Sequence, residues 1–268
     1  MFWYDGQLLQ KNTLELEIDN PGLLYGATVF TTLRVYQQSL NHPLTNWERH
    51  CSRLASSLQT LGWQLPDWQQ LCTGAQQLSV SYPILRITIF PDGREWITGR
   101  FLPPDLVQRQ QHGVTAWLAE APEYHRSLAN HKTGNYLPSW LAGQAARKMG
   151  ATEAILVDTR RRWLETSTGN LWGWHEGTWW TPPADGSILP GVMRSQLMDW
   201  LKKHHCPVRE ASWDSKQVLQ FEAIAYTNSV IEVIPIHTVL TASQSVTYNP
   251  LHSSIEQLRS LFSSHNKV

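Results

Sequence analysis

Short segments rich in β-branched and aromatic residues alternate with segments of helical periodicity along the chain, and this alternation limits the folds it can adopt. The mixture predicts an α/β fold of mixed α+β character rather than a doubly wound parallel sheet. Strands are predicted at residues 2–4, 7–9, 28–36, 84–90, 95–101, 114–118, 153–157, 162–165, 170–175, 178–181, 223–227 and 231–239. Helices are predicted at residues 47–61, 66–78, 136–149, 191–203 and 250–262.

A polar stretch at residues 119–130 separates two parts of the chain. It is predicted to connect a small N-terminal α/β domain, residues 1–118, to a larger C-terminal domain, residues 131–268. In the N-terminal part, Thr45 and Glu48 have the spacing of a capping box, which predicts the start of a helix at this point.

The charges of the 268-residue chain balance, with 22 Lys and Arg against 22 Asp and Glu. This balance gives no field that would attract nucleic acid or an anionic membrane surface. No uninterrupted apolar run reaches the roughly 18 residues of a membrane helix, and residues 1–6 lack the pattern of a signal peptide. The three cysteines show no metal-ligand spacing, so we expect no bound metal, a reducing compartment and a cytoplasmic protein.

The chain contains 14 tryptophans. They are scattered through the predicted strands and helices, so packing in cores and interfaces is the favoured interpretation. The alternative is a non-catalytic module that stacks a sugar or an aromatic ligand on exposed indole rings. Such a module would be colourless, and its affinity for the ligand would not depend on a lysine.

Two short segments carry the residues best suited to catalysis. Lys132 follows His131 and precedes a predicted helix, and Glu165 ends a predicted strand 33 positions later. An amine that forms a Schiff base and an acid that faces a pyridine nitrogen are the groups that pyridoxal phosphate (PLP) chemistry requires. Either residue taken alone would more often lie on the surface.

Three further segments have features of phosphate-binding sites. Residues 188–194 form a turn that opens a helix, and the first amides of a helix have no helical partner. Residues 226–229 end a strand with several hydrogen-bond donors, and Arg53 lies beside the apolar face of its predicted helix. The ordinary alternatives are a glycine-started helix, a polar turn and a salt bridge to a carboxylate.

Taken in order, these segments resemble the fold-type IV PLP enzymes, which include branched-chain aminotransferases, D-amino-acid aminotransferases and 4-amino-4-deoxychorismate lyases. The resemblance extends from Phe2 to about Pro235. It includes the run Tyr-Gly-Ala-Thr-Val-Phe-Thr-Thr-Leu-Arg at residues 25–34, the arginine helix at residues 50–54 and the pattern Glu-x-x-x-x-Asn at residues 165–170.

The resemblance implies a two-domain fold, PLP as the cofactor and a homodimer. It implies that Lys132 forms the Schiff base, that Glu165 binds the pyridine nitrogen and that Tyr136 contacts the oxygen of the cofactor ring. The remaining cofactor-binding residues that it implies are Arg53, Asn170, Val192, Met193, Thr227 and Asn228.

The run Phe-Thr-Thr at residues 30–32 and the short chain resemble 4-amino-4-deoxychorismate lyase. This resemblance implies the conversion of 4-amino-4-deoxychorismate to 4-aminobenzoate and pyruvate, a step of folate biosynthesis. Lys132 would move the protons, with help from Thr31 or Thr32. The charge and strand position of three arginines predict that they hold the substrate carboxylates: Arg34, Arg86 and Arg100.

Two features depart from the lyase pattern. The turn at residues 91–94, Pro-Asp-Gly-Arg, differs from the glycine- and arginine-rich turn of these lyases, and the run Gly-Asn-Tyr at residues 134–136 resembles the transaminase branch. The alternative function is therefore a branched-chain or D-amino-acid aminotransferase. In that enzyme Lys132 and Glu165 would have the same roles.

Overall fold

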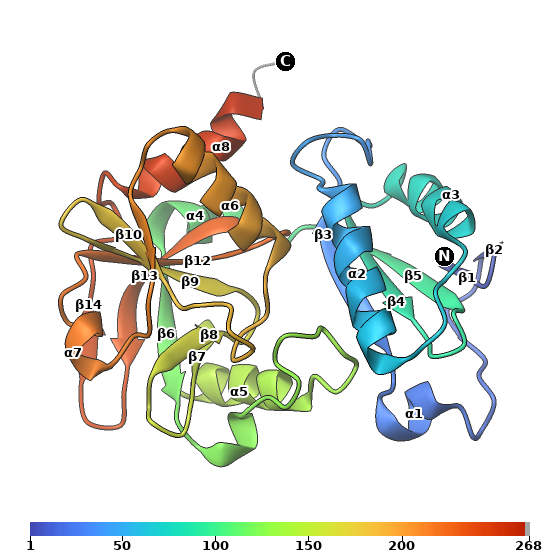
Figure 1. The fold of residues 1–268 in the computed structure, drawn as a ribbon, viewed down its shortest axis with the longest axis horizontal. Coiled ribbons are helices and arrows are strands. Elements are labelled where there is room, and N and C mark those ends of the chain that lie inside the picture. The colour runs from blue at the N-terminus through green and yellow to red at the C-terminus, as the bar shows by residue number, and fades with distance from the viewer. Residues whose placement is uncertain (266–268) are drawn as a thin grey trace. The chain divides into compact units, whose positions relative to one another are not determined.

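The computed structural model describes residues 1–265, and the chain divides into two compact units (Figure 1). Unit 1 contains residues 1–103 and 131–135, and unit 2 contains residues 104–130 and the chain from Tyr136 onward. The expected boundary at residue 118 differs from this division, because the strand at residues 114–119 pairs in parallel with two strands of unit 2. The expected connection, residues 119–130, belongs to unit 2 as well.

Unit 1 is built on an antiparallel sheet with the strand order β2-β1-β5-β4-β3. Helices α2 and α3 pack on one face of this sheet (Figure 1). The strands are β1 (Phe2–Tyr4), β2 (Gln7–Leu9), β3 (Val29–Arg34), β4 (Ile84–Ile89) and β5 (Glu95–Arg100), and the helices are α1 (Pro21–Tyr25), α2 (Trp47–Leu61) and α3 (Trp68–Ser79).

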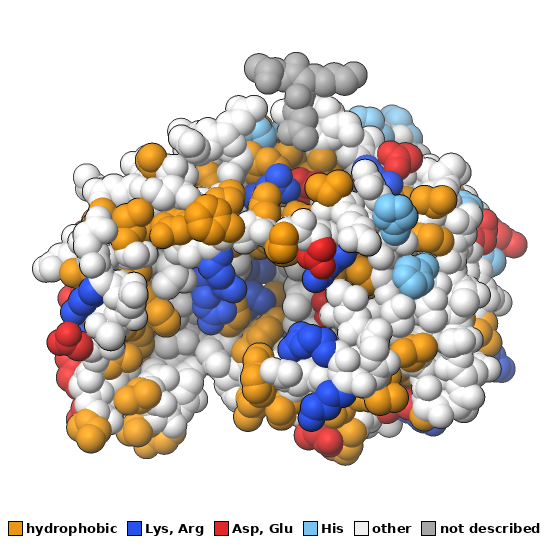
Figure 2. Space-filling model, turned by 180° about the vertical axis from the view of Figure 1, so that it is seen from behind, with side chains coloured by type: hydrophobic (Ala, Val, Ile, Leu, Met, Phe, Trp, Pro, Cys, Tyr) orange, Lys and Arg blue, Asp and Glu red, His pale blue; other side chains and the backbone are white. Residues whose placement is uncertain are grey.

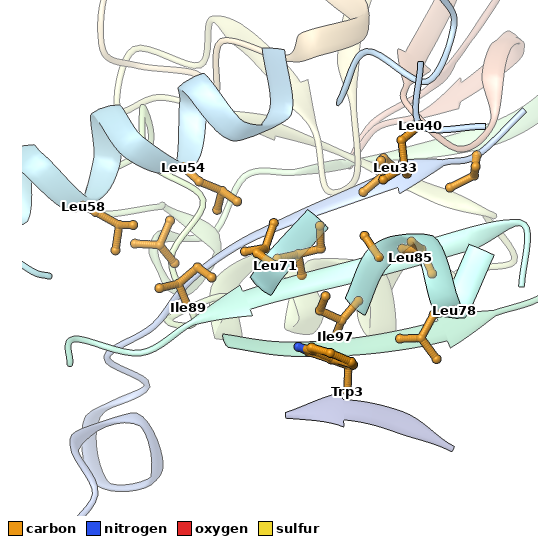
Figure 3. Packing of buried hydrophobic residues seen from close by; sticks show 14 residues of the cluster. Trp3, Leu33, Leu40, Leu54, Leu58, Leu71, Leu78, Leu85, Ile89 and Ile97 are labelled. Carbon is orange, nitrogen blue, oxygen red and sulfur yellow. The ribbon is translucent and has the colours of Figure 1, made fainter. Parts of the chain in front are cut away.

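The core of unit 1 lies between the sheet and these two helices. In Figure 3, Leu33 of β3, Leu54 and Leu58 of α2 and Leu71 of α3 point toward this common core. All four side chains are buried, and burying a leucine contributes roughly 1.5–3 kcal/mol. Because side chains alternate along a strand, the residues on either side of Leu33 face away from the helices. The sheet of unit 1 thus has one apolar, covered face and a second face that carries polar and charged side chains.

The strands of unit 2 close into a ring. Their order is β11-β10-β9-β12-β13-β6-β7-β8, and β8 also pairs with β9 through Glu165 and Asn170. The strands are β6 (Val114–Ala119), β7 (Glu153–Val157), β8 (Trp163–Thr166), β9 (Asn170–His175), β10 (Thr178–Thr181), β11 (Val208–Glu210), β12 (Ala223–Asn228) and β13 (Glu232–Leu240), with β14 (Ser245–Thr247) paired to β13. The helices are α4 (Leu106–His112), the 3₁₀ turn η1 (Pro122–Tyr124), α5 (Leu137–Lys148), α6 (Val192–Lys203), α7 (Ser215–Val218) and α8 (Ile255–His265).

The predicted α+β mixture is confirmed, and each predicted strand has a counterpart in the structure. The predicted capping box is wrong. The residue before α2 is Asn46, which has a left-handed backbone (φ 54°) and makes no capping bond. The Thr45 hydroxyl instead donates to the Ser39 carbonyl and accepts from the Tyr36 amide, so it stabilises the preceding loop. The last helix begins at Ile255, not near residue 250.

Five of the 14 tryptophans are buried, eight are half-buried and Trp140 is exposed, which favours packing over a stacking surface. Trp172, Trp179 and Trp213 are completely buried, and the first two rings meet edge to face. In Figure 2, hydrophobic side chains are dispersed among polar ones over the visible face. None of the helices within residues 1–265 is long and apolar enough to span a bilayer. The same residues hold no group of three or more His, Cys, Asp or Glu side chains arranged for a metal ion.

Candidate active site

Lys132 is held at the edge of the sheet of unit 1. The Phe30 amide donates to the Lys132 carbonyl (2.8 Å), and the Gly134 amide donates to the Thr28 carbonyl (2.7 Å). A side chain at Gly134 would place its Cβ 2.3 Å from Thr28 Oγ1, so only glycine allows this close approach. Residues 131–135 thereby extend the sheet beside β3, which explains why they belong to unit 1.

The Lys132 side chain lies on the face of this sheet that points away from α2 and α3. Its Nζ atom is 4.8 Å from the centre of the Phe30 ring. The Arg86 guanidinium lies 3.5 Å from the centre of the same ring. Thr32 is directly opposite Arg86 in the pairing of β3 with β4, so it shares this face. An amine, a hydroxyl and a guanidinium are therefore grouped around Phe30.

The other two predicted substrate arginines lie on the same face, two residues along the strands from the Thr32–Arg86 pair. Arg34 and Arg100 both stand opposite Ile84, from the two neighbouring strands. The Arg34 guanidinium lies 4.6 Å from the centre of the Tyr36 ring, and Arg100 is exposed. The structure thus brings the three predicted arginines to one sheet face, where Arg86 and Lys132 both lie against the Phe30 ring.

Arg53 and Thr31 meet on the opposite, covered face. Arg53 Nη2 donates to Thr31 Oγ1 (2.7 Å), and Thr31 Oγ1 also contacts Nδ1 of His50 (2.6 Å). Thr31 and His50 are completely buried. Burial, together with the positive charges of Arg53 and Lys132, holds the pKa of His50 well below its usual range, so the imidazole is neutral.

In unit 2, Glu165 lies at the closure of the strand ring. Its carboxylate accepts the Leu189 amide (3.1 Å) and forms a buried ion pair with Arg126, whose guanidinium also lies 5.3 Å from the centre of the Tyr136 ring. The Tyr136 hydroxyl donates to the Ser167 carbonyl (3.2 Å), and burial raises its pKa to about 12. Tyr136 is therefore a neutral hydroxyl at ordinary pH.

Asn170 links Glu165 to the start of α6. It pairs with Glu165 on one side and with Thr227 on the other, and its Nδ2 donates to the Leu189 carbonyl (2.9 Å). A Cβ at Gly191 would lie only 2.0 Å from Asn170 Oδ1, so glycine is required where α6 begins.

The start of α6 offers backbone donors. Gly191 is the N-cap residue and provides no side chain, so the first amides, including those of Val192 and Met193, have no partner within the helix. The nearby Thr227 hydroxyl accepts from Trp172 Nε1 (3.0 Å) and retains its own proton for donation. Asn228 differs: its amide nitrogen donates to the Thr168 carbonyl and its oxygen accepts two backbone amides of the following turn.

A buried carboxyl, Glu153, supports the turn that follows Glu165. It accepts the hydroxyls of Ser167 and Thr168 and the amide of Ala154, and burial raises its pKa. The Ser167 carbonyl also accepts a hydrogen bond from the Tyr136 hydroxyl. Glu153 therefore fixes the backbone that Tyr136 contacts, although the residue lies outside every predicted site.

We expect Glu153→Gln to destabilise the protein, because the glutamine NH₂ would face a hydroxyl that now donates to a carboxylate. The expected loss in free energy of unfolding is about 1–3 kcal/mol. Urea unfolding of this variant and of Glu123→Gln, which changes an exposed glutamate, measures it. Equal stability of the two variants would contradict the supporting role of Glu153.

The residues present suit PLP by their chemistry. Unit 1 supplies an amine at Lys132 and a cation at Arg53, and unit 2 supplies a buried carboxylate at Glu165 and a helix N-terminus with a glycine cap. These groups match an aldehyde, a phosphate and a basic ring nitrogen.

Sequence reasoning missed three participants: Arg126, His50 and Glu153. Arg126 lies within the stretch predicted to be a connection, and its pairing with Glu165 depends on a fold that brings together residues 39 positions apart. His50 had a local signal, because it precedes Arg53 by three residues and so shares one face of a helix with it. Glu153 had none.

Comparisons with known proteins identify the family. Residues 28–239 match the family model for amino-transferase class IV. An aminodeoxychorismate lyase from Vibrio harveyi is 23% identical over 264 residues, which cover 92% of this chain and 94% of the relative.

Solved structures show the same fold. The branched-chain amino acid aminotransferase of Escherichia coli superposes with a TM-score of 0.84 at 20% identity, covering 98% of this chain and 93% of that one. A hypothetical aminotransferase from Mycobacterium tuberculosis in a PLP-bound form gives a TM-score of 0.82 at 19% identity, with 98% and 99% covered. The family match spans most of the chain, and we conclude that this protein is a PLP-dependent enzyme of the class IV aminotransferase family.

Proposed function

We propose that this enzyme is a lyase that converts 4-amino-4-deoxychorismate to 4-aminobenzoate and pyruvate. The observation that carries the proposal is the grouping of Lys132, Thr32 and Arg86 around Phe30 on one sheet face. The reaction needs a base, a proton donor and a cation for substrate carboxylates, and these three side chains are of those types. The lyase from Vibrio harveyi, similar over nearly its full length, adds support.

Each candidate cofactor residue has a role in this proposal. Arg53, the first amides of α6 and the Thr227 hydroxyl bind the phosphate. Glu165 keeps the pyridine nitrogen protonated, and Tyr136 donates to the ring oxygen. Asn170 positions the carboxylate of Glu165 and the start of α6, since it contacts both. Asn228 shapes the turn after Thr227.

PLP, when bound, supplies an electron sink for the substrate's amino-bearing ring. Lys132 removes the proton from the ring carbon that carries the amino group. The bond to the enolpyruvyl oxygen then breaks, and Lys132, with Thr32, returns a proton to the departing three-carbon group. Arg86, together with Arg34 and Arg100, holds the carboxylates. The atoms of the substrate equal those of the two products, so no co-substrate is consumed.

The lyase reaction consumes no co-substrate, and this property provides the test. The purified enzyme, loaded with PLP, is incubated with 4-amino-4-deoxychorismate in the absence of any keto acid. We expect 4-aminobenzoate and pyruvate in equal amounts. If product appears only when a keto-acid acceptor is added, the lyase assignment is wrong.

An aminotransferase is the second candidate, and two observations favour it. The Gly134–Tyr136 run resembles the transaminase branch, and the Escherichia coli branched-chain aminotransferase shares the fold. In this enzyme Lys132 would move a proton between the substrate and the cofactor. Incubation with a branched-chain or D-amino acid and a keto acid would then yield the exchanged pair.

We also propose a cytoplasmic homodimer, on the basis of the family resemblance. Light scattering measured during gel filtration should give about twice the chain mass of 30.7 kDa. A single-chain mass at micromolar concentration would contradict the dimer.

A further inference from the structure

We propose that Thr31 and His50 are positioning residues, which orient Arg53 for phosphate through a directed chain of two hydrogen bonds. This inference rests on the proposed role of Arg53 in binding the cofactor phosphate. It assigns Thr31 a function different from the proton transfer predicted from the sequence.

The three side chains come from two packed elements. His50 and Arg53 are three residues apart on α2, so they lie on one face of that helix. Thr31 lies on β3 with Val29 and Leu33 as its neighbours on the core face. The Thr31 oxygen bridges the two α2 side chains, at 2.7 Å from Arg53 Nη2 and 2.6 Å from His50 Nδ1.

The direction of the chain follows from counting protons. A guanidinium has donors only, so Arg53 donates to the Thr31 oxygen. The Thr31 hydroxyl proton then needs an acceptor, and among residues 1–265 the His50 Nδ1 atom is the acceptor within reach. Nδ1 is therefore unprotonated, and His50 carries its proton on Nε2. The neutral state that this requires agrees with the lowered pKa of His50.

The Nε2 atom of His50 is buried and has no hydrogen-bond partner in the described part of the chain. A buried imidazole with one unsatisfied nitrogen is costly, by roughly 1–3 kcal/mol. A leucine would fill such a core position without this cost. The cost is explained if the acceptor at Nδ1 is needed, because that acceptor fixes the Thr31 hydroxyl and leaves its lone pairs for Arg53.

The hydrogen bond from one Nη atom to Thr31 restricts the orientations open to the Arg53 guanidinium. An arginine side chain has several rotatable bonds, and ordering it on binding lowers affinity. An arginine that is already oriented loses less freedom when a phosphate binds. The Thr31–His50 pair therefore acts on the phosphate, and only through Arg53.

The experiment compares the affinities of the apoprotein for PLP and for pyridoxal, which lacks the phosphate. Thr31→Val removes the hydroxyl at nearly constant volume, and Thr31→Ser keeps it. We expect Thr31→Val to weaken PLP binding about tenfold and to change pyridoxal binding less than twofold. Thr31→Ser should bind both compounds as the parent does. His50→Asn, whose amide oxygen takes the place of Nδ1, should keep most of the affinity, whereas His50→Phe should not.

A double-mutant comparison separates positioning from packing. In an Arg53→Ala background, Thr31→Val should have no further effect on the ratio of the two affinities. If Thr31→Val lowers the affinities for PLP and pyridoxal equally, or still acts without Arg53, the pair only packs the core and the inference is wrong. Should Thr31→Val fail to fold, Thr31→Ala can be used in its place, because it removes the same hydroxyl.

The outcomes also distinguish this inference from the proposed function. If Arg53→Ala binds PLP as tightly as the parent, the phosphate role of Arg53 fails, and with it the premise. If Arg53→Ala binds PLP more weakly but Thr31→Val keeps the parent's ratio of PLP affinity to pyridoxal affinity, only the inference about Thr31 and His50 fails.

Discussion

Lys132→Ala is expected to reduce product formation at least about a thousandfold, because both the cofactor attachment and the proton transfer depend on this amine. The variant should also lose the yellow colour of the loaded enzyme. Unit 1 should remain folded, since the contacts of residue 132 with β3 use its backbone carbonyl. Product formation and the absorbance spectrum are the two measurements.

Lys148→Ala is the matched control, because Lys148 is an exposed lysine at the end of α5. It should keep the colour and the activity of the parent. A Lys132→Ala protein that stays yellow and active would show that another amine carries the cofactor. Loss of both properties in the two variants alike would indicate a general effect of removing a lysine.

Glu165→Gln should have the second largest effect, and it should lower both the activity and the stability of the protein. Activity should fall roughly a hundredfold, because a neutral amide cannot keep a pyridine nitrogen protonated. Stability should fall as well, because Arg126 would lose the anion that balances its charge. The side chains of Arg126 and Glu165 are 7% and 5% exposed, and removing one partner of such a pair typically costs about 3–5 kcal/mol.

The two effects can be separated with a second substitution. Replacing Arg126 by Met in the Glu165→Gln protein removes the unbalanced charge, so urea unfolding should show most of the stability restored. The activity should remain low, because the carboxylate is still absent. If the double variant regains activity together with stability, the carboxylate at position 165 serves the fold and not the chemistry.

The strands and long helices were predictable from the sequence because periodicity reports which face of an element is buried. The helix α2 is an example: its apolar positions repeat at helical spacing, and Gly62 adopts the left-handed conformation that ends it. The short elements α4 and α7 were not predicted. Their few residues carry too little periodicity to show in the sequence, and α4 is stabilised by packing against β13.

The domain boundary could not be read from the sequence for a physical reason. Composition marks residues 119–130 as polar, but polarity does not say which strand a segment pairs with. β6 joins unit 2 through β13 and β7, which lie far along the chain. Residues 131–135 return to unit 1 because their backbone completes the edge of β3.

The candidate site was predictable where a motif is local. Lys132, Glu165 and the start of α6 each stand in a short recognisable run. Their partners depend on tertiary contacts, as Arg126 beside Glu165 and His50 beside Thr31 illustrate. Thr31 and Thr32 show most clearly what local sequence cannot predict. Adjacent in sequence, they point to opposite faces of β3, and only Thr32 shares the face of Lys132.

Whether Lys132 carries PLP is tested by borohydride reduction of the PLP-loaded enzyme, followed by proteolysis and mass spectrometry. We expect a phosphopyridoxyl group on the peptide that contains Lys132, with no comparable label on other lysines. A label located elsewhere while Lys132 remains unmodified, or no label on a protein saturated with PLP, would contradict it.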